Sequence, residues 1–276
     1  MLVEFKSRLR KLIDELSRRL FQVLPGFLTD GRLTRTLSVR RHGGEVFRMR
    51  DFGGLTRMRV ITFETKEPET LGWIDGFASG ERLLDVGANV GLYSLYAASR
   101  GCEVCAIEPD AGNFALLQEN IRLNSFFRPG LIRSYALALH SSFMISELNI
   151  SGSQWGAALN SFANTTDFKG DEFEPLFKQG CVGVSLDVLL DETSFCPHHI
   201  KIDVDGNEIE VLRGASGYLK SKTLKSLLIE LDERRKDYGE ALAIIQSSGL
   251  RLTEKIPGAL VANTQFDRTF NHIFSR

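Results

Sequence analysis

Two glycines and two acidic residues near residue 90 have the spacing of a small-molecule binding loop. The stretch LLDVGANVGLYS, residues 83–94, ends an apolar run with Asp85 and then places Gly87 and Gly91 in the turn. A second apolar run, CEVCAIE, ends in Glu108, seventeen residues after Gly91. Glycines let the backbone of such a turn approach a ligand, and a strand-end carboxylate can accept hydrogen bonds from paired hydroxyls. The pattern indicates a nucleoside or dinucleotide site, or a turn that binds nothing.

The residues of the loop favour S-adenosylmethionine over a nicotinamide dinucleotide. A dinucleotide loop reads GxGxxG, and its second glycine lets the backbone reach the pyrophosphate. Asn89 stands at that position here, and Asp85 would repel a pyrophosphate. The same Asp85 can help to neutralise a cationic ligand, whereas Glu108 can accept both ribose hydroxyls of a nucleoside. We therefore predict an S-adenosylmethionine site, with S-adenosylhomocysteine as the product, and keep the ligand-free turn as the alternative.

Three ionisable residues alternate along the later segment HIKIDVDG, and we predict that they are catalytic. Lys201, Asp203 and Asp205 would lie on one side of a buried strand, which is costly unless they are paired or exposed at its end. Methyl transfer to a hydroxyl needs an aligned acceptor and a proton acceptor. One aspartate could be that base, or two could hold a divalent metal, which we do not predict. The structural alternative is a Lys201–Asp203 pair with Asp205 capping the next helix.

Three further residues are candidates for contact with the acceptor. Glu230 ends the next strand, SLLIELD, at the same sheet edge. His140 follows the third strand and could act as a base, although an exposed loop histidine is the favoured interpretation. Trp155 lies in the polar stretch 149–161 and could stack on a sugar face, but a half-buried tryptophan in a surface hairpin fits equally well.

The elements that would position these residues alternate between strand and helix from residue 82 onward. Repeated units of this kind predict a doubly wound, mostly parallel sheet with helices on both faces, as in a Rossmann-like fold. A polar stretch over residues 146–170 interrupts the alternation. The expected strands are 82–88, 103–109, 131–138, 199–204, 226–232, 250–256 and 270–276, and the expected helices are 90–99, 113–124, 207–220 and 237–248.

Several of these motifs together resemble the FkbM family of S-adenosylmethionine-dependent methyltransferases. The resemblance spans roughly residues 64–276, and KIDVDGNEIEVLRGA is its most specific part. It implies a class I methyltransferase fold and, usually, O-methylation of a sugar, a polyketide or another small hydroxylated acceptor. The cofactor contacts that the resemblance implies are Asp85, Gly87, Ala88, Asn89, Gly91, Glu108, Pro109 and Asp110, with Ala136 and Leu137 beside the adenine.

The N-terminal part of the chain is a separate extension in our prediction, residues 1–63, ahead of a methyltransferase domain over residues 64–276. Leucines and other apolar residues recur at helical spacing over residues 1–24, with a basic opposite face. This helix could bind a membrane surface or a partner, but packing on its own domain is the favoured interpretation. Residues 36–64 have paired glycines between alternating segments, which predicts short strands and turns.

The composition of the chain narrows the partners and the cellular compartment that we expect. The 34 basic and 35 acidic residues nearly cancel, which argues against a nucleic-acid partner. The CxxC pair at Cys102 and Cys105 has no second ligand pair, so buried thiols and a cytoplasmic setting are expected, with the N-terminal helix as the candidate for peripheral membrane contact. We predict an O-methyltransferase acting on a sugar or glycan hydroxyl. The alternatives are an N-methyltransferase and a cofactor-binding, non-catalytic subunit of glycan assembly.

Overall fold

The computed structural model describes residues 35–125, 131–257 and 266–276. Its main element is a seven-stranded sheet with the order β12-β13-β11-β10-β3-β4-β5. Neighbouring strands are parallel from β11 to β5, and β13 is antiparallel to both β11 and β12. The predicted doubly wound, mostly parallel α/β fold is therefore confirmed. The helix expected over residues 1–24 lies outside the described residues.

The strands of this sheet are β3 (Arg82–Val86), β4 (Glu103–Ile107), β5 (Ile132–Tyr135), β10 (His199–Ile202), β11 (Ser226–Asp232), β12 (Arg251–Pro257) and β13 (Thr269–Ser275). The remaining strands are β1 (Thr36–Arg41), β2 (Gly44–Arg50), β6 (Ala138–Leu139), β7 (Met144–Ile150), β8 (Ser161–Phe162) and β9 (Phe177–Val184). The helices are α2 (Gly54–Ile61), α3 (Phe63–Lys66), α4 (Pro68–Asp75), α5 (Leu92–Ser99), α6 (Ala111–Leu123), α7 (Leu186–Thr193), α8 (Glu208–Arg213) and α9 (Tyr238–Ser247).

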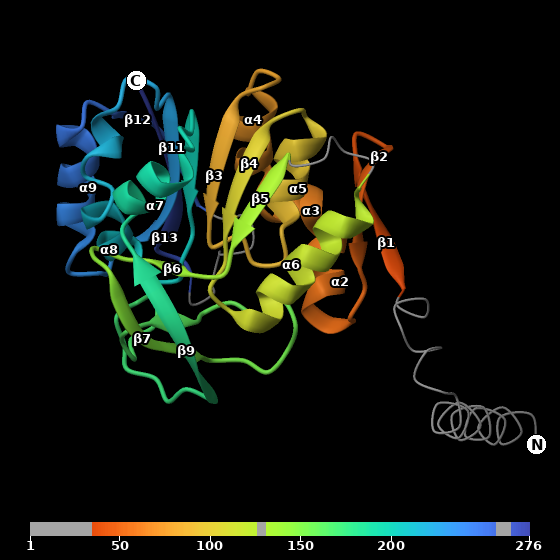
Figure 1. Ribbon diagram of the computed structural model, residues 1–276, viewed down its shortest axis with the longest axis horizontal. Helices are drawn as coiled ribbons and strands as arrows, with labels where there is room; N and C mark the ends of the chain where they lie inside the picture. The colour runs from red at the N-terminus through yellow and green to blue at the C-terminus, as the bar shows by residue number, and fades with distance from the viewer. Residues whose placement is uncertain (1–34, 126–130, 258–265) are drawn as a thin grey trace, which may run out of the picture. The chain divides into compact units, whose positions relative to one another are not determined.

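Two apolar cores cover the two faces of the sheet. One contains side chains of α4, α5 and α6, and the other contains side chains of α7, α8 and α9. In Figure 1, α5 and α6 lie to the right of the central strands, and α8 and α9 lie to the left. Cys102 and Cys105 belong to different cores, as their spacing on a strand predicts. Both are buried free thiols, and burial raises the pKa of Cys105 to about 12.

The segment before the first strand of the sheet differs in part from its prediction. β1 and β2 form the expected antiparallel pair, and Val39, Phe47 and Met49 join the core that contains α5. Residues 54–61, however, form helix α2 and not strands and turns. The prediction followed the Gly53-Gly54 pair, but both glycines have positive φ and the turn they make leads into a helix. Pro68 occupies the first turn of α4 after Glu67, where its fixed φ suits a helix start.

The polar interruption of the sequence builds a second sheet. Strands β6, β9, β7 and β8 pair in that order, and β7 and β9 lie below the ends of β3, β4 and β5 in Figure 1. The strand expected over residues 131–138 is therefore two strands, β5 in the main sheet and β6 in this one. The helix expected over 207–220 is also shorter: α8 ends at Arg213, and residues 218–220 form a separate 3-10 turn.

Candidate functional site

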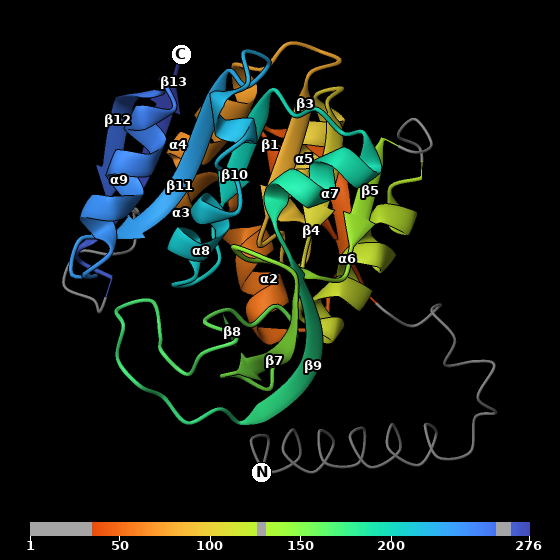
Figure 2. The ribbon, with the colours of Figure 1, turned by 60° about the vertical axis from the view of Figure 1, so that its left-hand side comes forward.

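A cavity lies beyond the carboxyl ends of β3, β4 and β10, where the strand order of a doubly wound sheet reverses. Polar residues from three strand ends face it: Gly87 and Asn89 after β3, Glu108 after β4, and Asp203 and Asp205 after β10. Its other wall is apolar, and this wall consists of Ile107, Pro109, Leu137, Leu139, Leu148 and Phe162. Figure 2 shows β7 and β8 of the second sheet beneath this end of the main sheet.

The two glycines of the loop allow close packing inside the protein. A Cβ on Gly87 would lie 1.8 Å from the Asp203 carbonyl oxygen, so the loop touches the backbone after β10. A Cβ on Gly91 would lie 2.5 Å from Leu117 Cδ1 of α6. Both glycines have positive φ. Gly91 therefore permits tight packing of α5 and α6, whereas Gly87 makes room for the chain after β10.

Glu108 is the residue best placed to bind paired hydroxyls. Its side chain lines the cavity although the residue is only 5% exposed. Each carboxylate oxygen accepts one backbone N–H, from Asn89 at 2.8 Å and from Asp110 at 2.9 Å. Burial raises the pKa of Glu108 to about 8, because these two hydrogen bonds offset only part of the desolvation. A second acceptor position remains on each oxygen.

Asp85 lies beneath the loop and is not among the residues that line the cavity. It is 1% exposed and accepts a 2.6 Å hydrogen bond from Ser94 on α5. Its other oxygen has no hydrogen-bond partner among the described residues. Burial raises the pKa of Asp85, and the charge of Lys201 on the neighbouring strand opposes that shift. Asp85 therefore interacts with Ser94 and with the charge of Lys201 inside the protein, and it does not face the cavity.

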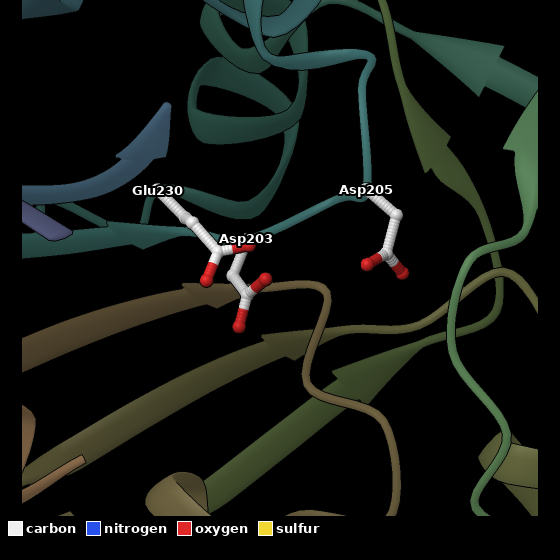
Figure 3. A group of neighbouring side chains, drawn as sticks. All are labelled: Asp203, Asp205 and Glu230. Carbon is white, nitrogen blue, oxygen red and sulfur yellow. The ribbon is translucent and has the colours of Figure 1, made fainter. Parts of the chain in front are cut away.

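Three carboxylates converge at the ends of β10 and β11. Oxygens of Asp203, Asp205 and Glu230 lie within 4.8 Å of one another. Figure 3 shows Asp203 and Glu230 next to each other, with Asp205 on the loop that follows β10. Lys201 donates to Asp203 Oδ2 at 2.7 Å. Three such oxygens could also bind a divalent cation. We assign no metal to them, and the absence of a metal from the site stays a prediction.

The pKa values of two of these carboxyls are shifted upward. Burial, followed by the nearby charge of Asp203, raises the pKa of Asp205 to about 7. The same two causes raise the pKa of Glu230 well above its usual range. Asp205 accepts a hydrogen bond from the Leu159 N–H at 2.7 Å. The alternative in which Asp205 caps the next helix is wrong, because Asn207 occupies the N-cap of α8.

Residues 154–160, which we call the covering segment, connect the elements around the cavity. The Ala157 carbonyl accepts from the side-chain amides of Asn89 at 2.8 Å and Asn113 at 2.9 Å. Arg59 on α2 donates to the Gly156 carbonyl at 2.8 Å. With the Leu159 contact described above, these bonds tie the covering segment to four separate parts of the chain. Ala157, Ala158 and Asn160 line the cavity.

The remaining predicted residues take different positions. Pro109 and Leu137 line the cavity, whereas Ala136 is exposed and Ala88 is buried behind the loop. The Asp110 carboxylate caps α6 by accepting from the Asn113 N–H.

None of the three acceptor candidates, Glu230, His140 and Trp155, is among the residues that line this cavity. His140 lies 3.7 Å from a Glu210 oxygen and packs edge-on against Phe162. Trp155 is 45% exposed, and its ring centroid lies 5.3 Å from that of Phe52. The structure thus brings together the candidates on β10 and β11 and leaves His140 and Trp155 outside the group.

Sequence reasoning missed three residues of the site. Glu67 is buried and accepts hydrogen bonds from Lys66 and Thr70, and its charge raises the pKa values of Lys201 and Glu230. Tyr93, on α5, has its ring 5.1 Å from Lys201 Nζ. Asn113 lines the cavity and holds the covering segment. The sequence signal available for Glu67 was the pair of acidic residues in the stretch EPE, residues 67–69, ahead of the first strand of the main sheet. The contacts of Tyr93 and Asn113 arise only in the folded chain.

The residues present fit S-adenosylmethionine. Glu108 offers two free acceptor positions to ribose hydroxyls, and the apolar wall suits an adenine ring. The carboxylates near β10 and β11 suit a cationic group.

A doubly wound fold with this strand order and this site defines a class I methyltransferase fold. Residues 85–252 match the family described as the methyltransferase FkbM domain. The chain therefore belongs to the FkbM family of methyltransferases, which confirms the resemblance in its sequence.

Individual relatives are similar to this chain at low identity. The hexuronic acid methyltransferase AglP of Haloferax volcanii is 26% identical over 204 residues, which is 72% of each protein. The crystal structure of methyltransferase FkbM from Methylobacillus flagellatus KT is 18% identical, with a TM-score of 0.47. That match covers 72% of this chain but only 44% of the other. Magnesium protoporphyrin IX methyltransferase from Synechocystis PCC 6803 is 10% identical, covers 82% and 84% of the two chains, and gives a TM-score of 0.45.

Among the described residues, no helix is long and apolar enough to cross a membrane.

Proposed function

We propose that this protein is an S-adenosylmethionine-dependent O-methyltransferase whose acceptor is a hydroxyl of a sugar or glycan. The observation that carries the proposal is the pairing of two sites in one cavity. Glu108, with two free acceptor positions, lines the same cavity as Asp203 and Asp205, and an oxygen of Glu230 lies within 4.8 Å of oxygens of both aspartates. The similarity to a hexuronic acid methyltransferase supports a sugar acceptor.

The cofactor, when bound, supplies an electrophilic methyl group. Glu108 would hold the ribose, the apolar wall would enclose the adenine, and the loop at Gly87 would contact the amino-acid part. The covering segment lines the cavity and is held in place by hydrogen bonds from Asn89, Asn113 and Arg59, so it would limit the access of water to the bound cofactor. Exclusion of water strengthens the electrostatic contacts inside such a site.

Asp205 is the residue that we assign to accept the proton of the hydroxyl. A general base works best when its pKa is close to the working pH, and the pKa of Asp205 is about 7. Its Oδ2 atom is fixed by the Leu159 N–H, which leaves Oδ1 to take the proton. Lys201 donates to Asp203 beside it, and a Glu230 oxygen lies within 4.8 Å of oxygens of both aspartates.

The proposal is tested by incubating the full chain with S-adenosylmethionine and a panel of methyl glycosides of neutral hexoses and of hexuronic acids. Mass spectrometry detects a methylated product, and mild alkali separates methyl ethers, which survive, from methyl esters, which hydrolyse. A methyl ether is expected. A product that is only an ester would show that a carboxylate is the acceptor, and the absence of any product with bound cofactor would favour the non-catalytic alternative.

A further inference from the structure

Asn113, on α6, uses both ends of its side-chain amide to hold the covering segment. The residue is 3% exposed and lines the cavity. Its Oδ1 atom accepts a hydrogen bond from the Gly156 N–H at 2.9 Å, and its Nδ2 atom donates to the Ala157 carbonyl at 2.9 Å. Because the amide group is planar, these two bonds fix both the position and the orientation of this part of the chain.

Other partners hold single carbonyl groups of the covering segment. Asn89 Nδ2 donates to the same Ala157 carbonyl at 2.8 Å. The Ser151 hydroxyl donates to the Ala158 carbonyl at 3.0 Å. Asn113 differs from these partners because it bonds two successive residues of the segment, an N–H of one and a carbonyl of the next.

Two residues after Ala157, the covering segment contacts Asp205. The Leu159 N–H donates to Asp205 Oδ2 at 2.7 Å. Leu159 and Asp205 both have positive φ, at 65° and 55°. Positive φ is uncommon for residues other than glycine, and it persists where the surrounding contacts determine the backbone. The position of the Leu159 N–H therefore depends on the hydrogen bonds that fix the segment just before it.

We propose that Asn113 is a positioning residue of the methyl-transfer site. By fixing the peptide groups of Gly156 and Ala157, it places the Leu159 N–H on Asp205 Oδ2. That donor leaves Oδ1 of Asp205 to take the proton of the acceptor hydroxyl. The inference rests on the proposed function for its consequence in catalysis, but the hydrogen bond from Leu159 to Asp205 can be measured without an acceptor.

The test compares Asn113→Ala with a matched control, Asn124→Ala, at the other end of the same helix. Asn124 is also buried, and its amide bonds a peptide segment of β2. Its Oδ1 atom accepts from the Arg48 N–H at 2.8 Å, and its Nδ2 atom donates to the Arg48 carbonyl at 2.7 Å. The control therefore removes the same kind of contact from β2 instead of the covering segment. Asn113→Ser, whose shorter side chain cannot bond both peptide groups, replaces Asn113→Ala if that variant does not fold.

The first readout is the backbone amide ¹H–¹⁵N spectrum of the ligand-free full chain, recorded from pH 5 to pH 9. An amide proton that donates to a carboxylate shifts downfield as the carboxylate ionises. The Leu159 signal should therefore titrate with Asp205, near pH 7, in the wild type and in Asn124→Ala. In Asn113→Ala this titration should be lost. A Leu159 titration of wild-type size in Asn113→Ala would overturn the inference.

The titration of Leu159 is assigned to Asp205 by its loss in Asp205→Asn. Charged groups from several elements act on Asp205, and neither Asn113→Ala nor Asn124→Ala changes any of them. These groups are Asp203, Glu208, Glu230, Glu108 and Arg59.

The second readout is the rate with the methyl glycoside that gives the highest wild-type activity in the panel above. Asn113→Ala should lower kcat about 10- to 100-fold, because misplacement of a reacting group by about 1 Å costs that much. The acid limb of its kcat profile should also move to higher pH, since the Leu159 N–H stabilises the ionised form of Asp205 and its loss raises the pKa of Asp205. Asn124→Ala should change neither.

The affinity for S-adenosylhomocysteine, measured by calorimetry, separates positioning from cofactor binding. Asn113→Ala should change it less than about threefold, because Glu108 keeps both of its N–H donors. An unchanged kcat, with or without weaker cofactor binding, would overturn the inference. Absence of wild-type turnover would contradict the proposed function, while the Leu159 titration would still decide whether Asn113 places this hydrogen bond.

Discussion

Adenosine should bind this protein more tightly at pH 8 than at pH 6, because Glu108 must ionise before it can accept both ribose hydroxyls. Burial raises the pKa of Glu108 to about 8. The ionised fraction is then about 1% at pH 6, about 10% at pH 7 and about half at pH 8. A ligand that needs the ionised form binds with an apparent affinity reduced by that fraction. The dissociation constant of adenosine should fall about tenfold from pH 6 to pH 7, about fivefold more by pH 8, and level off above pH 9.

Adenosine is a suitable probe because neither its ribose nor its adenine titrates in this range. Calorimetric titration of wild-type protein and Glu108→Gln with adenosine and with 2′-deoxyadenosine separates the effects. A hydrogen bond to a charged group contributes about 1.5–3 kcal/mol, so Glu108→Gln should weaken adenosine binding about 10- to 100-fold at pH 9 and abolish the pH dependence. A pH-independent affinity for adenosine in the wild type, or equal wild-type affinity for the two nucleosides at pH 9, would refute the role of Glu108.

The same group makes a prediction for the stability of the free protein. Because the folded-state pKa of Glu108 lies above its ordinary value, the folded state binds the proton more tightly than the unfolded state. This contribution to stability is fully present below about pH 4.5 and is lost as the pH rises to about 8, at up to about 1.4 kcal/mol per pH unit. Urea denaturation at several pH values should show a smaller loss over this range in Glu108→Gln. Identical pH dependence in both proteins would contradict the assignment.

Three further substitutions test other parts of the site. Asp205→Asn should lower kcat by about 10²–10⁴-fold, the usual contribution of a general base, and a normal rate would remove Asp205 from that role. Gly87→Ala places a Cβ 1.8 Å from the Asp203 carbonyl oxygen and should destabilise the protein by more than about 2 kcal/mol in urea denaturation. Gly80→Ala, also at positive φ but with open space around it, should cost only about 1 kcal/mol, and equal losses would argue against the backbone contact. Lys201→Met leaves buried carboxylates without their counter-charge and should cost about 3–5 kcal/mol, which the same denaturation measures.

The parallel sheet could be predicted because its signal is local. Each strand is a short apolar run, and each turn is marked by a glycine or an acid at the strand end, so the positions of Asp85 and Glu108 followed from the pattern. The same reasoning put Asp203, Asp205 and Glu230 at one sheet edge, where the structure has them together. The carboxyl ends of parallel strands necessarily share an edge.

The covering segment could not be predicted in this way. Its contacts join residues far apart in the chain, such as Asn89 with Ala157 and Arg59 with Gly156. Periodicity and spacing report neighbours along the chain, whereas these interactions exist only once the sheet has formed.

The central claim is that the cavity beyond β3, β4 and β10 binds S-adenosylmethionine, and calorimetry tests it most directly. The full chain should be titrated in parallel with S-adenosylmethionine, S-adenosylhomocysteine and NAD. Our account predicts binding of the first two and none of NAD. Binding of NAD, or binding of none of the three, would contradict it.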